Sequence, residues 1–127
     1  MAVTKRVPIK RFKMDVRYKD NWAGDWTGAT PLTSRNRMVG HDEIVIPSRD
    51  IVMVYGEGDY VCDTATVEHR SPNPKGWTRG ALRSVILKDH RKFDKQGNIW
   101  GHVLDDMFIE QVSFNPRTKI VKIFMGS

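Results

Sequence analysis

The chain has 127 residues, 28% of them charged and 39% hydrophobic, and a formal net charge of +6 at pH 7. A chain of this length is that of one domain, so we expect residues 1–127 to share a single core. Apolar side chains occur along most of the chain, which argues against long disorder. No apolar run reaches the roughly 20 residues that cross a bilayer, so the sequence predicts no membrane partner.

Cys62 is the only cysteine, so no intrachain disulfide is possible. The chain does not open with a charged start followed by an apolar run and a cleavage site. We therefore expect a reducing compartment, either the cytoplasm or a virion inside an intracellular assembly. Cys62 falls in the strand-like run 60–67, which favours a small buried thiol over a nucleophile.

The charges are distributed in blocks along the chain. Seven basic residues against one acid give residues 1–19 a charge of +6, and nine acids against three arginines give residues 20–69 a charge of −6. Eight basic residues against two acids return residues 70–95 to +6, and residues 96–127 are balanced. Complementary blocks of this kind favour function through binding.

The N-terminal third of the chain is predicted to contain an arm, a strand and a loop. Residues 1–6 form a basic arm, and apolar side chains at every second position of residues 12–18 predict a strand with one buried face. Residues 19–40 are rich in Gly, Asn, Asp, Ser and Thr, which predicts a long loop with at most one short strand. Loops of this length are uncommon in compact domains, and those that occur usually have a function. Trp22 and Trp26 either close this loop or protrude from it as anchors for a partner.

The segment 7–26 as a whole is a short basic strand that leads into a loop of Asp, Gly and Trp residues. In this it resembles the small barrel proteins at the head-to-tail junction of tailed bacteriophages. The resemblance implies a structural component of a viral or phage-like assembly. It assigns no functional residue to this chain.

The middle of the chain is predicted to contain short strands. Residues 43–46 and 51–55 are β-branched runs separated by a hairpin or a change of direction, and residues 56–59 form a tight turn. A strand over 60–69 ends before Pro72, because proline cannot continue the ladder.

The next segment, 78–90, fits two structures. Its apolar spacing, with Thr78 as N-cap, suits a helix, whereas residues 84–93 also suit a strand that pairs with 99–104 across a turn at 94–98. We favour the strand.

Near the C-terminus, residues 107–114 and 119–125 predict a hairpin around the turn Asn115-Pro116-Arg117-Thr118. Together the segments predict a mainly β domain, a small antiparallel barrel or sandwich. One short helix near 78–88 is compatible with this, with α+β as the fallback class.

Candidate catalytic chemistry is sparse. The four histidines have acidic neighbours, but adjacent residues on a strand point to opposite faces, so we expect no metal site. No phosphate-binding glycine loop or nucleophile motif is present, so we name no catalytic residue and no cofactor. A small metal-dependent nuclease remains an alternative, drawing on Asp59, Asp63, Glu68 and Lys88.

Two binding functions remain. The first is a non-enzymatic assembly module that docks a protein partner or a second copy, with contacts in the 19–40 loop and the basic arm, at Trp22, Trp26, Lys5 and Arg6. The alternative is a nucleic-acid-binding module that uses the basic segments 5–19 and 70–95. Its candidate residues are Arg11, Lys13, Arg17, Arg83, Arg91 and Lys92.

Overall fold

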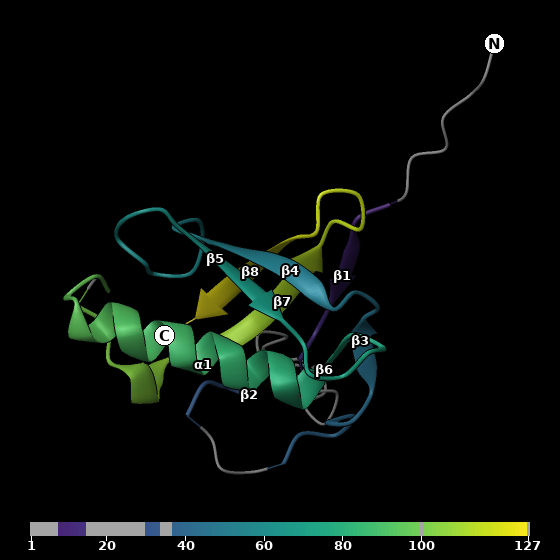
Figure 1. The fold of residues 1–127 in the computed structure, drawn as a ribbon. Helices are drawn as coiled ribbons and strands as arrows, with labels where there is room; N and C mark the ends of the chain where they lie inside the picture. The colour runs from purple at the N-terminus through teal and green to yellow at the C-terminus, as the bar shows by residue number, and fades with distance from the viewer. Residues whose placement is uncertain (1–7, 15–29, 34–36, 100, 127) are drawn as a thin grey trace.

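The computed structural model describes residues 8–14, 30–33, 37–99 and 101–126 (Figure 1). These residues form eight strands, one α-helix and one 3-10 helix. The elements are β1 (Lys10–Phe12), β2 (Thr30–Pro31), β3 (Ile44–Ile46), β4 (Asp50–Tyr55), β5 (Ala65–Arg70), β6 (Trp77–Thr78), α1 (Arg79–Lys95), η1 (Leu104–Asp106), β7 (Phe108–Phe114) and β8 (Ile120–Gly126).

Six of the strands form one open sheet in the order β1-β7-β8-β4-β5, with β2 also paired to β7. All pairs in this sheet are antiparallel except β4 with β8, which is parallel. Strands β3 and β6 form a separate two-stranded sheet. The prediction of a β-rich fold with one helix is confirmed. Among the described strands the main sheet does not close into a barrel, so the α+β description fits it better.

Helix α1 packs on one face of the main sheet (Figure 1). Every second residue of β4 is buried beneath it, because successive side chains of a strand point to opposite faces. The helix contributes Leu82, Ile86 and Phe93 to this core, all on one side of its surface. Fewer side chains are buried on the opposite sheet face, where Phe124 is 45% exposed. The domain is thus a sheet with one helix-covered face.

The predicted strand over 84–93 is wrong, because these residues lie inside α1. The helix begins after Thr78, whose hydroxyl accepts a hydrogen bond from the Ala81 N–H. Thr78 is therefore the N-cap, as the alternative helical prediction for this segment stated. It ends at Lys95, with Gln96 as C-cap, and the φ of 67° at the following Gly97 lets the Asn98 N–H reach the Phe93 carbonyl. Glycine with positive φ serves hairpin turns and helix ends alike, so the turn signal at 94–98 was assigned to the wrong structure.

Of the other predicted segments, one is confirmed and others differ from the prediction. The C-terminal hairpin is confirmed as β7 and β8. The runs 43–46 and 51–55 change direction rather than form a hairpin, since β3 pairs with β6. In the predicted loop 19–40, Thr30–Pro31 forms β2, and the described part includes the buried Leu32 and Met38.

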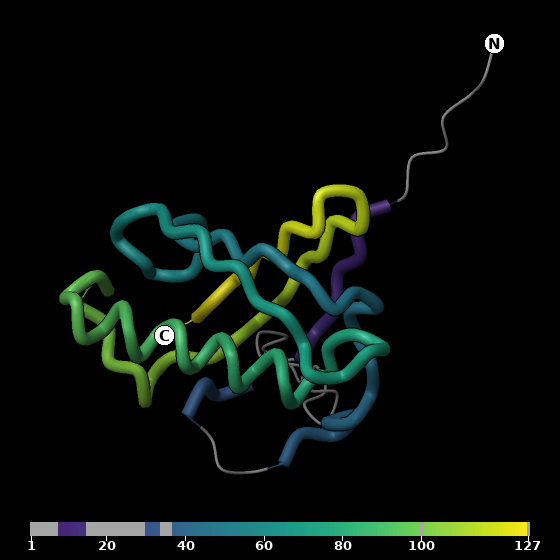
Figure 2. Tube along the Cα trace, in the orientation of Figure 1, coloured from purple at the N-terminus to yellow at the C-terminus, as the bar shows by residue number. Residues whose placement is uncertain are grey.

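The loop between β4 and β5 is longer than the predicted turn. Residues 56–64 precede β5, and the buried Asp59 carboxylate accepts from the N–H groups of Gly56 and Val61. Cys62 is half-buried in this loop rather than buried in a strand. Its N–H donates to the Asn98 carbonyl, which brings the loop beside the C-terminal end of α1 (Figure 2).

Candidate functional site

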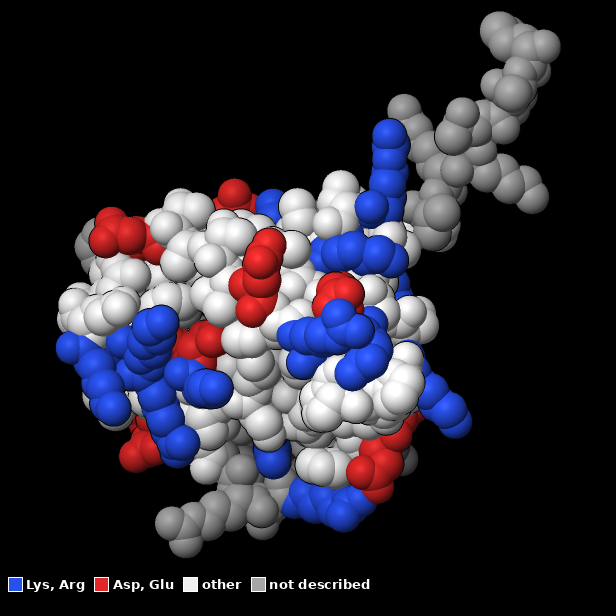
Figure 3. Space-filling model, in the orientation of Figure 1, with Lys and Arg blue, Asp and Glu red and all other residues white. Residues whose placement is uncertain are grey.

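On the face shown in Figure 3, Lys and Arg side chains gather over the C-terminal half of α1. Four cations of this helix are exposed. At about 100° per residue they project within an arc of about 100°, on the side away from the core residues Leu82 and Ile86. We call these four residues the basic row: Lys88, Arg91, Lys92 and Lys95.

The basic row is not ion-paired, although Asp94 stands three residues after Arg91 on the helix. None of its members forms a salt bridge with another described residue. Lys88 and Lys92 stand four residues apart, as do Arg91 and Lys95, so each pair is a like-charge neighbour on the helix surface. Such pairs destabilise a helix slightly, and an anion bound across them would relieve the repulsion.

A buried hydrogen-bond cluster fixes where the row points. Asp89 lies on the side of α1 next to Lys92, and its Oδ2 accepts from the Tyr55 hydroxyl at 2.6 Å. The Nε2 of His69, on β5, lies 2.8 Å from the same oxygen and donates to it. Of the basic row, Lys92 therefore lies nearest to β5.

The cluster itself is closed to ligands. Tyr55 is fully buried and Asp89 is 5% exposed. Burial raises the pKa of Tyr55 well above its ordinary value, and the charge of Asp89 and the hydrogen bond to it raise this pKa further. The neighbouring His90 donates from Nδ1 to the Ile86 carbonyl, and its buried Nε2 has no hydrogen-bond partner. The arrangement joins helix to sheet at a buried position.

The N-terminal end of α1 offers no anion site, because its free donors are already used. The Arg79 N–H donates to the Glu43 carbonyl and the Gly80 N–H donates to the His41 carbonyl. The buried Arg79 guanidinium pairs with the Glu43 carboxylate. Any anion held by this helix must bind along its side.

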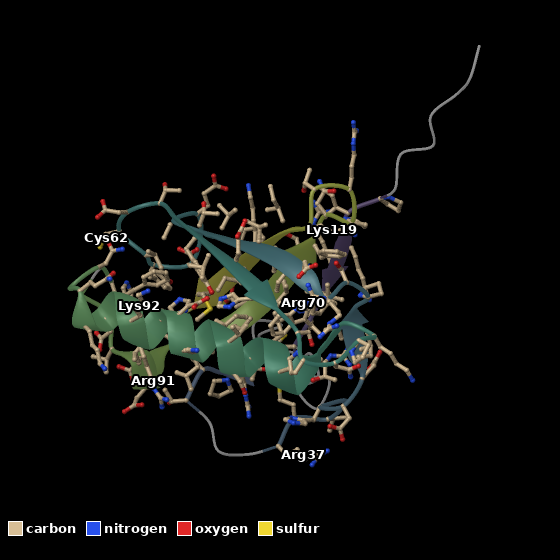
Figure 4. The ribbon with its side chains drawn as sticks, in the orientation of Figure 1. Arg37, Cys62, Arg70, Arg91, Lys92 and Lys119 are labelled. Carbon is tan, nitrogen blue, oxygen red and sulfur yellow. The ribbon has the colours of Figure 1, made fainter. Side chains whose placement is uncertain are left out.

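The structure brings together only part of the predicted nucleic-acid site. Arg91 and Lys92 are neighbours on the basic row, and Figure 4 labels both on α1. Arg83 is half-buried on the other flank of the helix and is already engaged in an interaction, as is Lys13. Arg11 lies on the far face of the sheet, in a hollow of about 380 Å³ with Glu57 and Lys122. Arg17 lies outside the described residues.

The predicted assembly contacts Trp22, Trp26, Lys5 and Arg6 also lie outside the described residues. The sequence prediction omitted Lys88 and Lys95 from the site. The spacing 88, 92, 95 is helical, and this signal was missed because the segment was assigned to a strand.

The four residues considered for a nuclease do not converge. The Asp59 carboxylate is held by backbone N–H groups inside its loop, and Asp63 is exposed in that loop. Glu68 lies on the sheet face opposite to the helix that carries Lys88. Among the described residues no cluster of three or more His, Cys, Asp or Glu side chains could hold a metal ion.

A second group of cations provides a contrast. Arg70 of β5 and Lys119 of the turn before β8 line one hollow of about 440 Å³ (Figure 4). Asp50 and Glu68 line the same hollow, and Asp50 lies 3.8 Å from Arg70. Charges of both signs are balanced there, so this surface lacks the excess charge of the basic row.

Searches of protein-family models, curated proteins and solved structures find no match to this chain. No helix among the described residues is long and apolar enough to cross a membrane.

Proposed function

We propose that this protein is a non-enzymatic binding module that docks an acidic partner protein within a larger assembly, and that the basic row of α1 is its contact surface. The proposal rests on four exposed cations of one helix that form no salt bridge with a described residue. A solvated helix face normally mixes both signs, since ion pairs at i and i+4 stabilise it. A row that keeps like charges together is the kind of surface that electrostatic docking uses.

Nucleic acid is the second candidate partner, and the same row favours it. Lysine and arginine side chains on a convex helix can contact phosphates, which bind independently of sequence. The two partners differ in salt dependence. Each phosphate contact with a duplex contributes about −0.9 to the slope of log affinity against log salt, so four contacts give about −3.6.

The test compares two charge reversals of equal size. Lys88→Glu with Lys92→Glu reverses two of the four charges of the basic row, and Arg70→Glu with Lys119→Glu makes the same change in net charge at the balanced hollow. Fluorescence anisotropy with labelled polyglutamate should show at least tenfold weaker binding for the first variant only. A 20-base-pair DNA duplex is titrated in parallel.

Equal binding by both variants would contradict the proposal, because the row would then have no special role. Tight duplex binding, with a slope of log affinity against log salt near −3.6, together with no polyglutamate binding, would show that nucleic acid is the partner instead of an acidic protein.

A further inference from the structure

Strand β5 forms one free edge of the main sheet. It is the last strand in the order, and it pairs only with β4. Its six residues pair in unbroken register, without a bulge, a proline or a glycine. At the other end of the sheet, β1 has three residues and β2 has two. Of the described edges, β5 is the one long enough to bind a strand.

The hydrogen bonds of β4 identify which groups of β5 face outward. The Ser71 N–H donates to the Arg49 carbonyl at 2.9 Å, so that pair is hydrogen-bonded across the ladder. In an antiparallel pair such positions alternate, so the backbone groups of Glu68 point away from β4. The Val52 N–H confirms this, since it lies opposite Glu68 and donates to Lys119 instead.

By the same alternation the outward groups belong to Thr66, Glu68 and Arg70. No described residue hydrogen-bonds to these outward groups. They are three successive sites at which an added strand can donate and accept.

Strand β5 approaches α1 at Asp89, the residue next to Lys92 on the helix surface. His69 of β5 contacts Asp89, and Lys92 and Lys88 follow around the same flank of α1. Lys88 and Lys92 are about 6 Å apart along the helix axis. Alternate residues of a strand are about 6.7 Å apart, so carboxylates at two successive positions on one strand face match the two lysines.

We propose that an extended acidic segment of the partner protein adds to β5 as a further strand, with alternate carboxylates directed at Lys88 and Lys92. This inference rests on the proposed function and specifies its mode of recognition. Backbone hydrogen bonds supply the affinity common to strand addition, and the two lysines select an acidic sequence. A nucleic acid has no alternating N–H and C=O groups, so it would bind the row without the edge.

The test uses an end-capped heptapeptide that alternates glutamate and valine, and a substitution that blocks the edge. Glu68→Pro removes an outward N–H that the sheet does not use, so far-UV circular dichroism should be unchanged. Glu68→Ala is the matched control, which removes the side chain and keeps the N–H. We expect at least tenfold weaker peptide binding by Glu68→Pro and unchanged or tighter binding by Glu68→Ala.

Two N-methylated forms of the peptide repeat the test on the unaltered protein. Methyl groups on one set of alternate residues should abolish binding, and methyl groups on the other set should not. Equal binding by both forms, or by Glu68→Pro and Glu68→Ala, overturns the strand addition. If Lys88→Glu with Lys92→Glu still weakens binding in that case, the proposed function stands. If it does not, both fail.

Discussion

The Asp89 carboxylate connects α1 to two strands of the sheet at a buried position. A carboxylate shielded from water is costly unless donors surround it, and here one oxygen accepts from both Tyr55 and His69. Tyr55 also packs edge-on against Phe93, with ring centroids 5.0 Å apart. These contacts fix the helix on the sheet and so determine the direction in which the basic row projects.

Replacing Tyr55 with phenylalanine should lower the free energy of unfolding by about 1–3 kcal/mol, because Asp89 loses one of two buried donors. Urea unfolding at pH 8 measures this loss. Tyr60→Phe is the matched control, since Tyr60 is half-buried and its hydroxyl has no hydrogen bond to a described residue. A loss no larger than that of the control would contradict the role of Tyr55.

The same variant has a distinctive pH dependence. The pKa of Tyr55 is raised in the folded state, so its contribution to stability is complete below about pH 10 and is lost as pH rises toward the folded pKa. The difference in unfolding free energy between the native protein and Tyr55→Phe should therefore shrink above pH 10. A constant difference from pH 8 to 11 would show that Tyr55 ionises normally in the folded protein.

At the scale of the element, both ends of α1 are well capped, whereas its exposed side carries like charges that repel one another. Thr78 caps the first turn and Gly97 closes the last one. Between them Lys88 has like charges at Arg91 and Lys92, with no acid facing it on that flank. This conflict between local stability and charge is typical of a functional surface.

The variant Lys88→Glu should separate stability from function. It replaces two repulsions with favourable pairs to Arg91 and Lys92, each worth about 0.2–0.5 kcal/mol. We expect a higher melting temperature at low salt, a gain that shrinks near 0.5 M salt, and weaker binding of the acidic peptide. A variant that gained stability and kept full binding would rule out Lys88 as a contact.

Much of this fold follows from local sequence signals, and the site does not. The hairpin of β7 and β8 was predictable because Asn115, Pro116 and alternating side chains agree on one structure. The segment of α1 carried both helical and strand signals, and packing of Ile86 and Phe93 against the sheet decided between them. The pairing of β4 with β8 joins strands distant in sequence, and no local pattern encodes it.

Because residues 84–93 were predicted as a strand, the basic row could not be predicted either. As a strand, residues 84–93 would direct Arg91 and Lys92 to opposite faces, whereas the helix places both in one row with Lys88. The free edge of β5 could not be predicted either, because it depends on the order of strands in the sheet.

For the whole molecule, the helix-covered side and the open side of the sheet differ in charge. On the helix-covered side His69 of β5 contacts Asp89 of α1, while Arg11 and Lys122 lie near Glu57 on the open side. We therefore expect binding on one side of the domain. The described part of the basic segment, residues 8–14, contributes to neither the row nor the edge.

The most direct test is a titration of ¹⁵N-labelled protein with the glutamate–valine heptapeptide, followed by amide chemical shifts. We expect the largest shifts at residues 66–70 and 88–95, with little change at Arg11, Ser113 and Lys122 on the open side. Shifts concentrated on the open side, with residues 66–70 and 88–95 unmoved, would contradict the assignment of the binding surface to α1 and β5.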